Sequence, residues 1–392
     1  MDISISTEGV TIMDFELTKQ QQQIVDQVRD FTAKRLLPGV VERDEASEFP
    51  LEAFKEFGRM GMFGLCYPTE FGGSDVGYLP YILAVEEVSK VDSSFGIGFS
   101  VNTSLYGGSV MYSSATDEQK KRFLSPIASG QAIGSFGLTE ATAGSDAAGQ
   151  QTIATKDGDD YILNGTKIFN TNGPIADYTV VYALTDPAIG IKGMCAFVLE
   201  KGMEGFHVGK LENKMGIRSA QVSEMVLSNV RVSADRMIAK PGEGFKLAMK
   251  TLDGGRIGVG AQALGLAEGA FDIAIDYLKK REQFGKPLYK QQYLAFKMAE
   301  LYADIEKARL VLYKAACLKE AGKPYTTDAA VAKLTCTDVA MKVTTECVQM
   351  LGGNGYMKEY HVERMMRDAK ITQIYEGTNE IQKLVISGGL FR

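Results

Sequence analysis

Residues 161–170 read YILNGTKIFN, a short run of β-branched and aromatic residues broken by asparagine and glycine. This composition is typical of a β-strand bounded by turn formers. Three further stretches of the same kind follow, namely DYTVVYALT (177–185), GMCAFVLEK (193–201) and EMVLSNVRV (224–232). Together they predict an antiparallel sheet or barrel in the middle of the chain, beginning near Ser135.

The segments that precede this sheet are predicted to be helical. Thr18 is a candidate N-cap for a first helix that Pro38 ends. Its apolar positions recur every three or four residues, as expected for one buried helix face: Ile24, Val25, Val28, Phe31 and Leu36. Residues 50–65, 78–91 and 117–124 predict three more helices.

After about Asp235 the chain is predicted to be helical to its end. Four long stretches with short connections favour a four-helix bundle: 244–278, 290–320, 327–351 and 363–387. Glycines between 254 and 265 lower helix propensity and indicate close approach of a helix or a ligand. The predicted fold class is α+β, with an N-terminal α-helical domain (1–126), a middle antiparallel β-barrel or sandwich domain (127–238) and a C-terminal four-helix bundle (239–392).

The composition excludes several classes of function. The 392 residues carry a formal net charge of −6, so there is no basic surplus for non-specific nucleic-acid binding. No run reaches the ~18 apolar residues of a membrane span, and residues 1–12 lack the pattern of a secretory signal. Five scattered cysteines favour core packing in a reducing compartment. With only His207 and His361, a histidine-rich metal site is impossible, and we expect no metal. The scattered cysteines and the lack of a signal pattern lead us to expect a cytoplasmic protein.

Four stretches could carry chemistry, although each also has an ordinary structural explanation. YEGTNE (375–380) contains two carboxylates that are typical of a solvated surface, and LGGNGY (351–356) is explained by a helix C-cap. GLTEATAGSD (137–146) is typical of a loop, and REQFGKPL (281–288) of an interhelical connection. Periodicity and spacing alone therefore leave the function undecided.

In combination and in this order, these stretches resemble the acyl-CoA dehydrogenase family over almost the whole chain, and most of all its short-chain, butyryl-CoA branch. The resemblance is carried by FGLTEATAGSDAAGQQTIAT (136–155), KTLDGGRIGVGAQALG (250–265) and RDAKITQIYEGTNEIQ (367–382). It implies FAD as cofactor, an acyl-CoA substrate, an electron-transferring flavoprotein as acceptor, a homotetramer and a role in fatty acid metabolism.

The resemblance also implies which residues bind FAD. The strand domain would contribute Phe136, Leu138, Thr139, Phe169 and Thr171, with Thr139 on the pyrimidine side of the ring and Thr171 near N5. A neighbouring subunit would contribute Arg281, Phe284, Gln292, Gln349, Gly352 and Gly353, where an arginine can meet a pyrophosphate bidentately. Thr378, Asn379 and Glu380 would complete the flavin contacts, and Ser145 would contact the CoA arm as well.

Glu376 matches the catalytic base of the family. Burial would raise its pKa, and its backbone N–H would stabilise enolate character at the thioester oxygen. Asp253, Arg256 and Gly377 would bind substrate together with Ser145. Proton and hydride would leave adjacent carbons in opposite directions, which gives a trans-2-enoyl-CoA.

Several positions depart from the family pattern. Ala141 replaces a usual proline, which predicts a looser loop, and Asn170 replaces a usual aliphatic residue. Gly96 stands where a glutaryl-CoA enzyme has an arginine, which disfavours glutarate. Glycines at 96 and 98 could instead make room for a larger acyl group. Residues 1–12 precede the usual start of the family at Met13.

The alternatives that stay open are a branched, cyclic, aromatic or dicarboxylic acyl-CoA, an oxidase, and an enoyl-CoA reductase that works with an electron-bifurcating flavoprotein. A non-enzymatic acyl-CoA-binding role would require a broken site, and the presence of Glu376, Thr171 and Arg281 argues against it.

Overall fold

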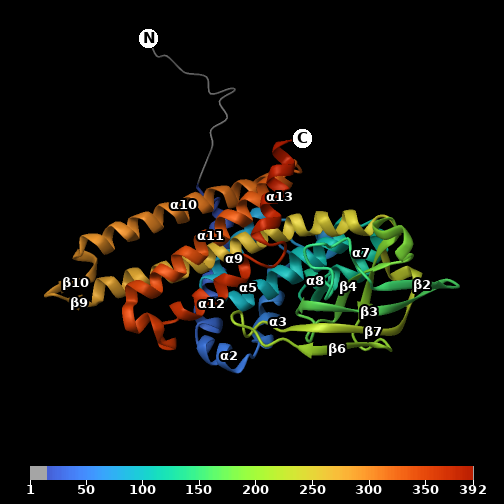
Figure 1. Ribbon diagram of the computed structural model, residues 1–392, viewed down its shortest axis with the longest axis horizontal. Coiled ribbons are helices and arrows are strands. Elements are labelled where there is room, and N and C mark those ends of the chain that lie inside the picture. The colour runs from blue at the N-terminus through green and yellow to red at the C-terminus, as the bar shows by residue number, and fades with distance from the viewer. Residues whose placement is uncertain (1–15, 392) are drawn as a thin grey trace, which may run out of the picture.

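A computed structural model describes residues 16–391 of the chain, so the expectations about residues 1–12 and Met13 lie outside the described residues. The molecule is elongated, with the sheet at one end and the hairpin-tipped helix bundle reaching to the other (Figure 1). No helix in the described part is long and apolar enough to cross a membrane.

The N-terminal third is helical, as predicted. Thr18 caps the first helix with a capping box, because its hydroxyl accepts from Gln21 N while the Gln21 side chain accepts from Thr18 N. The elements are α1 (Lys19–Phe31), the π-helix η1 (Thr32–Leu36), α2 (Val40–Ala46), α3 (Leu51–Arg59), η2 (Met62–Gly64), η3 (Thr69–Phe71), α4 (Tyr78–Ser89), α5 (Ser93–Ser100), the π-helix η4 (Val101–Gly107), α6 (Gly108–Tyr112), α7 (Asp117–Phe123) and α8 (Ser125–Ala128).

The middle of the chain forms an eight-stranded sheet in the order β6-β7-β3-β2-β4-β5-β8, with β1 paired to β4. The predicted antiparallel pairing is confirmed for most neighbours, but β1 and β2 each pair with β4 in parallel. The elements are β1 (Gly134–Gly137), β2 (Ile153–Asp157), β3 (Asp160–Thr171), β4 (Tyr178–Leu184), η5 (Pro187–Gly193), β5 (Met194–Glu200), β6 (Phe206–Leu211), β7 (Val222–Ser233), η6 (Ala234–Arg236) and β8 (Met237–Ala239).

Strand β4 is buried on both faces, which explains its continuous apolar sequence. Val180, Tyr182 and Leu184 join a core shared with the helices around η4 and α8. Val181 and Ala183 point to the opposite face and pack in a separate core with Phe197 and other sheet residues.

The C-terminal third forms the predicted bundle of long helices. Its elements are α9 (Gly244–Lys280), β9 (Glu282–Gln283), β10 (Lys286–Pro287), η7 (Leu288–Lys290), α10 (Gln292–Glu320), α11 (Thr326–Leu351), η8 (Gly352–Tyr356), η9 (Lys358–Tyr360), α12 (Val362–Thr372) and α13 (Asn379–Leu390). The prediction of one helical stretch at 363–387 is wrong, because the helix stops at Thr372 and restarts at Asn379.

Glycines let α9 approach α4 closely. Close approach of a helix was one of the two explanations that the sequence offered for the glycines of this segment, the other being close approach of a ligand. A Cβ atom at Gly265 would lie 2.2 Å from the Glu86 carbonyl oxygen, and one at Gly269 would lie 2.2 Å from that of Lys90. Side chains larger than hydrogen would therefore force the two helices apart.

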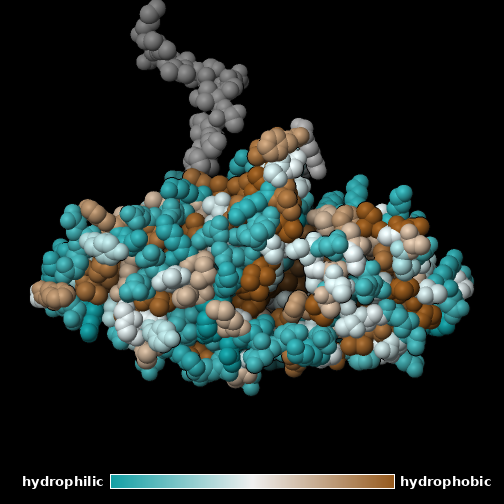
Figure 2. All heavy atoms as spheres, in the orientation of Figure 1, coloured by the Kyte–Doolittle hydropathy of each residue, from teal (hydrophilic) through white to brown (hydrophobic). Residues whose placement is uncertain are grey.

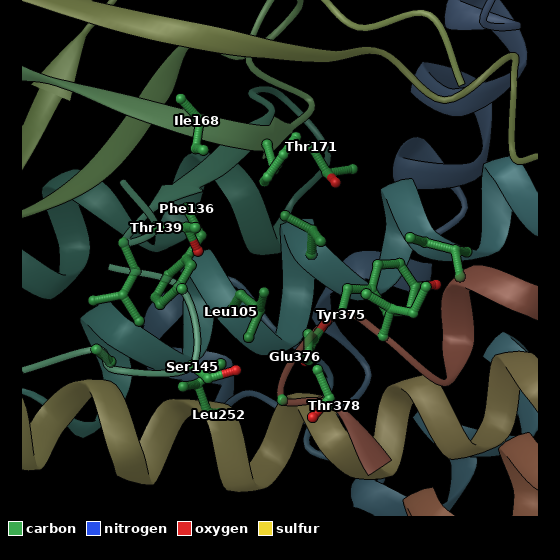
Figure 3. A pocket seen from close by; sticks show the side chains of 18 of the residues that line it. Leu105, Phe136, Thr139, Ser145, Ile168, Thr171, Leu252, Tyr375, Glu376 and Thr378 are labelled. Atoms are coloured by element: carbon green, nitrogen blue, oxygen red, sulfur yellow. The ribbon is translucent and has the colours of Figure 1, made fainter. Parts of the chain in front are cut away.

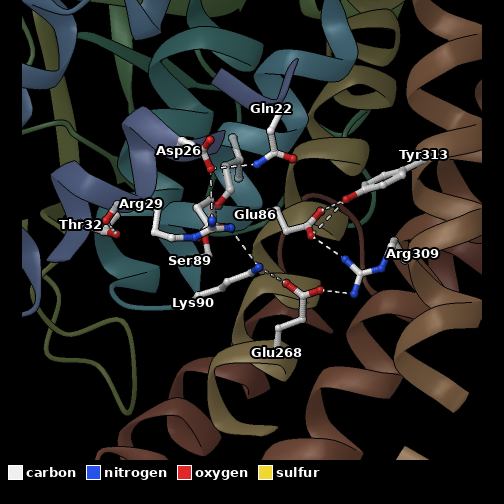
Figure 4. Close-up of polar contacts among 12 residues, drawn as sticks. Gln22, Asp26, Arg29, Thr32, Glu86, Ser89, Lys90, Glu268, Arg309 and Tyr313 are labelled. Carbon is white, nitrogen blue, oxygen red and sulfur yellow. Dashed lines mark hydrogen bonds and ion pairs between the residues drawn. The ribbon is translucent and has the colours of Figure 1, made fainter. Parts of the chain in front are cut away.

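A buried charge cluster ties α4, α9 and α10 together (Figure 4). Arg309 donates to Glu86 Oε1 at 3.0 Å and also pairs with Glu268, while Lys90 approaches Glu268 at 2.9 Å. Tyr313 OH donates to Glu86 Oε2 at 3.0 Å. Because both carboxylates have a cation, burying them is compatible with a stable bundle.

Candidate functional site

A cavity of about 710 Å³ lies where the sheet meets the bundle. Figure 2 shows a hollow edged by hydrophobic residues near the middle of one face of the molecule. In the close-up, Ile168 and Thr171 project from β3 on one side of the cavity, while Glu376 and Thr378 lie opposite, beside α9 (Figure 3). The walls are mostly apolar and include Ile97, Val101, Leu105, Leu252, Ile371 and Tyr375.

Ten of the residues singled out in the sequence line this one cavity. From the strand domain they are Phe136, Leu138, Thr139, Ser145, Phe169 and Thr171, and from the helical bundle and its C-terminal turn they are Arg256, Glu376, Gly377 and Thr378. Segments that are more than two hundred residues apart in sequence therefore converge on one space.

The remaining residues do not line the cavity. Asp253 instead pairs with Arg256 at 2.6 Å and accepts from Thr326 Oγ1 at 2.6 Å. Asn379 is buried, with its side chain bonded to α11, and Glu380 is exposed. A third group lies exposed around the far end of α9 and the end of α11, and includes Arg281, Phe284, Gln292, Gln349, Gly352 and Gly353.

Glu376 sits in the break between α12 and α13. Its φ is 51° and that of Gly377 is 93°, so two consecutive residues have a positive φ, which keeps α12 and α13 from forming one continuous helix. Thr378 then caps α13 by accepting from Ile381 N at 3.3 Å. In the described part of the chain the Glu376 N–H donates to no protein acceptor, so it is available to a ligand.

The Glu376 carboxylate is held without a hydrogen-bond partner. Both of its oxygens are buried and unpaired within residues 16–391. Burial raises the pKa of Glu376 to about 8, although the positive charges of Lys333 and Arg256 act in the opposite direction. A Cβ atom at Gly255 would lie 1.9 Å from Glu376 Oε2, so the missing side chain at 255 is what leaves room for this carboxylate.

A buried lysine organises the loop that carries Thr139. Lys167 Nζ donates to Glu140 Oε1 at 2.6 Å, to Gln150 Oε1 at 3.1 Å and to the Leu138 carbonyl at 3.2 Å. Burial lowers the pKa of Lys167 to about 8, while the Glu140 carboxylate favours its charged form. These bonds connect β3 to both ends of the loop and fix the backbone on each side of Thr139.

A bulge in β3 turns Phe169 toward the cavity. The pairing with β7 shifts register between Lys167 and Asn170, and Phe169 has a φ of 58°. Its side chain is 62% exposed, which is unusual for phenylalanine and suits a ring that covers a ligand. Asn170 faces inward and its side chain donates to the Ser223 carbonyl at 3.0 Å. The asparagine that replaces the usual aliphatic residue of the family therefore stabilises the bulge and does not line the cavity.

Two sequence inferences concern the surroundings of the site, and the looser loop expected at Ala141 stays a prediction. The backbones of Glu140 and Ala143 bond to each other at 3.2 and 3.1 Å, which closes the turn around Ala141. The idea that Gly96 and Gly98 make room for a larger acyl group is wrong. A Cβ at 96 would lie 2.2 Å from Ser89 Oγ and one at 98 would lie 3.1 Å from the Phe49 ring, and neither glycine lines the cavity.

Sequence reasoning missed several residues of the site. Phe245, Met249 and Leu252 line the cavity at the helical spacing of one face of α9, a signal that was present in the sequence. Ile97, Val101 and Leu105 come from α5 and the π-helix η4, whose irregular backbone no periodicity predicts.

The arrangement fits a planar, largely apolar group beside an acyl chain. Exposed Phe169 and apolar walls can cover a ring, and the Thr139, Thr171 and Thr378 hydroxyls can bond its polar edge. The unpaired Glu376 carboxylate and the unpaired Nε of Arg256 leave polar atoms for a ligand to meet. A buried carboxylate with a raised pKa next to an apolar cavity can remove a proton from a bound carbon acid.

Models of the acyl-CoA dehydrogenase family match nearly all of the chain: the N-terminal domain at residues 18–131, the middle domain at 135–230 and the C-terminal domain at 242–391. The short-chain specific acyl-CoA dehydrogenase of Clostridium acetobutylicum is 53% identical over 380 residues, which cover 97% of this chain and 100% of that protein.

Two solved structures share the fold and about half of the sequence. Butyryl-CoA dehydrogenase from Megasphaera elsdenii superimposes with a TM-score of 0.95 at 51% identity, over 97% of this chain and 100% of that chain. A chain from a structure of the electron transferring flavoprotein of Acidaminococcus fermentans, described as bearing on a mechanism of flavin-based electron bifurcation, gives a TM-score of 0.96 at 52% identity, with the same coverage.

Proposed function

The chain belongs to the acyl-CoA dehydrogenase family, and from this membership we propose that it oxidises a short-chain acyl-CoA to the trans-2-enoyl-CoA. A short acyl chain is supported by the names of the relatives from Clostridium acetobutylicum and Megasphaera elsdenii. The observation that carries the proposal is the buried, unpaired carboxylate of Glu376, which lies against α9 at Gly255.

Glu376 is the proposed catalytic base. With its pKa raised to about 8, its carboxylate is a stronger base than an ordinary glutamate and still ionises near neutral pH. The free N–H of Glu376 can donate to the thioester oxygen and stabilise the negative charge that develops as the α-proton leaves. The apolar walls exclude water, which keeps the abstracted proton on Glu376 Oε1 or Oε2.

FAD is the cofactor of this family, and when bound it supplies the acceptor for the hydride from the β-carbon. The residues proposed to hold it within one chain are Thr139, Phe169, Thr171 and Thr378, together with Phe136, Leu138 and Ser145, all of which line the cavity. Ser145, Arg256 and Gly377 are proposed to meet the acyl-CoA itself, and Asp253 to orient Arg256.

A second subunit is proposed to complete the FAD site. The proposed contacts lie outside the cavity of their own chain, and those exposed on the surface are Arg281, Phe284, Gln292, Gln349, Gly352 and Gly353. Phe284 is 93% exposed, and Tyr293 and Phe296 beside it are 74% and 60% exposed, which is typical of an interface rather than a free surface. We propose a homotetramer in which these residues meet a neighbour's FAD, with domains divided near residues 126 and 238.

The proposed electron acceptor is an electron-transferring flavoprotein. The similar chain from the work on the flavoprotein of Acidaminococcus fermentans supports this partner. The same similarity favours one alternative, an enoyl-CoA reductase that receives electrons from a bifurcating flavoprotein. The proposed site residues are compatible with this alternative, because they would serve both directions of the reaction.

Anaerobic addition of butyryl-CoA to the purified yellow protein tests the reaction. We expect bleaching of the flavin absorbance in a single turnover, and a panel of longer, branched and dicarboxylic acyl-CoAs ranks the substrates. Fast peroxide formation in air would indicate an oxidase, and a colourless protein that takes up no FAD would indicate a binding role and contradict the proposal.

The Glu376→Gln variant tests the base. Glutamine keeps the size of the side chain but accepts no proton, so we expect FAD and acyl-CoA binding to persist while flavin reduction slows by at least about a thousandfold. Glu118→Gln, an equal change on the exposed surface of α7, is the control. Reduction at the wild-type rate in Glu376→Gln would assign the base to another residue.

A further inference from the structure

Lys333 is a fully buried lysine in the N-terminal half of α11, and it does not line the cavity. A buried ammonium group is rare unless its protons are used. Here Nζ donates to the Gly377 carbonyl at 2.9 Å and to Asn379 Oδ1 at 2.9 Å. Both acceptors lie in or just beyond the break that carries Glu376, so α11 is bonded directly to the turn of the base.

The contact with Asn379 is itself fixed by α11. Asn379 Nδ2 donates to Asp338 Oδ1 at 2.8 Å and to Thr337 Oγ1 at 3.0 Å. Gln373, on the other side of the break, donates to the same Asp338 oxygen at 2.7 Å. Both ends of the segment 373–379 are therefore held against one face of α11, with Glu376 between them.

The Gly377 carbonyl is held from a second direction as well. Gln382 Nε2, from the first turn of α13, donates to it at 2.7 Å. A carbonyl that accepts from two donors cannot rotate freely. The peptide between Gly377, the residue after the base, and Thr378 is therefore fixed. The left-handed φ of Glu376 costs free energy by itself, whereas Gly377 adopts a positive φ readily, so these bonds help to maintain the conformation of Glu376.

Lys333 also differs from the other cation near Glu376 in how its charge is balanced. Arg256, from α9, forms an ion pair with Asp253 at 2.6 Å, which offsets much of its charge. Among residues 16–391, the direct acceptors of Lys333 are both neutral, namely Gly377 and Asn379. Burial lowers the pKa of Lys333 to about 7, and the nearby Glu376 carboxylate acts against that decrease, so each group favours the charged form of the other.

Two phenols also lie near the base, and both are neutral at neutral pH. Tyr375, next to Glu376, donates its hydroxyl to Gln262, and Tyr81 of α4 bonds Ser100; burial raises the pKa of both phenols. Asp338 and Glu380 act on Lys333 rather than on Glu376.

We propose that Lys333 is the positioning residue of the catalytic base, clamping the 375–378 turn through the Gly377 carbonyl and favouring the ionised form of the Glu376 carboxyl. The proposal rests on the proposed function of Glu376. It assigns Asn379 to the orientation of Lys333, in place of the flavin contact that the family resemblance implied for it.

Two substitutions separate the two roles of Lys333. Lys333→Met removes the hydrogen bonds and the charge but keeps the length of the side chain. Lys333→Gln removes the charge and keeps an amide donor for Gly377. Lys342→Met is the matched control, because Lys342 lies on the same helix but is half exposed and pairs with Asp304 on the surface at 2.7 Å.

The first measurement is hydrogen–deuterium exchange of peptides that cover 373–382 in the FAD-loaded protein without substrate. We expect faster exchange confined to this segment in Lys333→Met, near wild-type exchange in Lys333→Gln and no change in Lys342→Met. Wild-type protection in Lys333→Met would overturn the clamp, and this readout does not depend on the activity of the protein.

The second measurement is the pH profile of single-turnover flavin reduction by butyryl-CoA. Without the charge of Lys333, the apparent pKa of the base should rise by ~1 unit in both variants, so that reduction near pH 7 slows about tenfold and recovers at high pH. A uniform loss at every pH, or a profile that superimposes on that of the wild type, would overturn the electrostatic role. If the wild type itself is not bleached by any acyl-CoA, the proposed function fails, while the exchange experiment still decides the clamp.

Discussion

Glu376, the proposed catalytic base, is a residue at which catalysis and stability would oppose each other. Its oxygens are buried without partners, and burial places its folded-state pKa near 8, above the 4.5 of an ordinary glutamate. The folded protein therefore holds this proton more tightly than the unfolded chain does. Ionisation costs nothing below pH ~4.5, costs more as the pH rises toward 8, and costs its full amount above 8.

This cost predicts how Glu376→Gln changes stability with pH. The variant should be more stable than the wild type, with the difference small near pH 5 and growing to at most ~4 kcal/mol near pH 9, since a neutral amide needs less solvation than a carboxylate. Thermal midpoints of the FAD-loaded, substrate-free proteins between pH 5 and 9 measure it. A difference that is constant across this range, or that shrinks as the pH rises, would show that Glu376 is not buried as described; Glu118→Gln should show no trend.

Single residues of the site were predictable only in part from the sequence. Residue spacing alone could not distinguish Glu376 from a surface acid, and the family resemblance was what selected it. Lys333 gave no signal in VAKLT (331–335), because a lysine in a helix is usually solvated and only the tertiary structure buries this one. Asn379 lay in a motif that resembles the family, but its side chain is bonded to α11.

At the scale of elements, local patterns predicted most helices and strands but not the break at 373–378. The apolar spacing continues through it, since Ile371, Ile374, Tyr375, Thr378 and Ile381 follow a helical period. All five line the cavity, so a pattern that normally marks a core face here marks the wall of a site. The helix is interrupted by Gly377 and by bonds from α11, which only the tertiary structure reveals.

The crossing of α9 and α4 makes a prediction about helix packing. Gly265→Ala should lower stability by about 1–3 kcal/mol, because the new Cβ would lie 2.2 Å from the Glu86 carbonyl oxygen, a backbone atom that cannot move aside cheaply. Urea midpoints of the FAD-loaded protein measure the change.

Gly388→Ala is the matched control for this crossing. Gly388 is also helical, but a Cβ there meets no atom of the described residues within 4 Å, so alanine should be neutral or stabilise α13 by roughly 0.5–1 kcal/mol. Equal effects at the two positions would mean that helix propensity, and not the close crossing, explains the glycines of α9.

At the scale of the whole molecule, the cavity of one chain is proposed to be completed by another. Arg281 is exposed at the end of α9, far in sequence from the strand residues that line the cavity. Arg281→Ala should weaken FAD retention and assembly together, because a guanidinium that pairs with a pyrophosphate across an interface contributes to both. Flavin content after gel filtration, with mass from light scattering, measures the two effects.

A variant that stays fully flavinated and tetrameric would contradict the role of Arg281. Lys279→Ala, which removes an exposed cation from the same last turn of α9, is the control and should change neither property.

The position of the break has a consequence for the far C-terminus. Glu376 lies three residues before the twelve-residue helix α13, of which only Asn379 and Gln382 are buried, while Leu384, Leu390 and Phe391 are 66%, 70% and 88% exposed. The terminal helix packs on α11 but leaves much of its apolar surface exposed within a single chain, and it bears the Thr378 cap and the Gln382 amide that hold the turn. The first turn of α13 therefore belongs to the support of the Glu376 turn, so a change that undocks Thr378 or Gln382 should loosen that turn while the rest of the molecule remains folded.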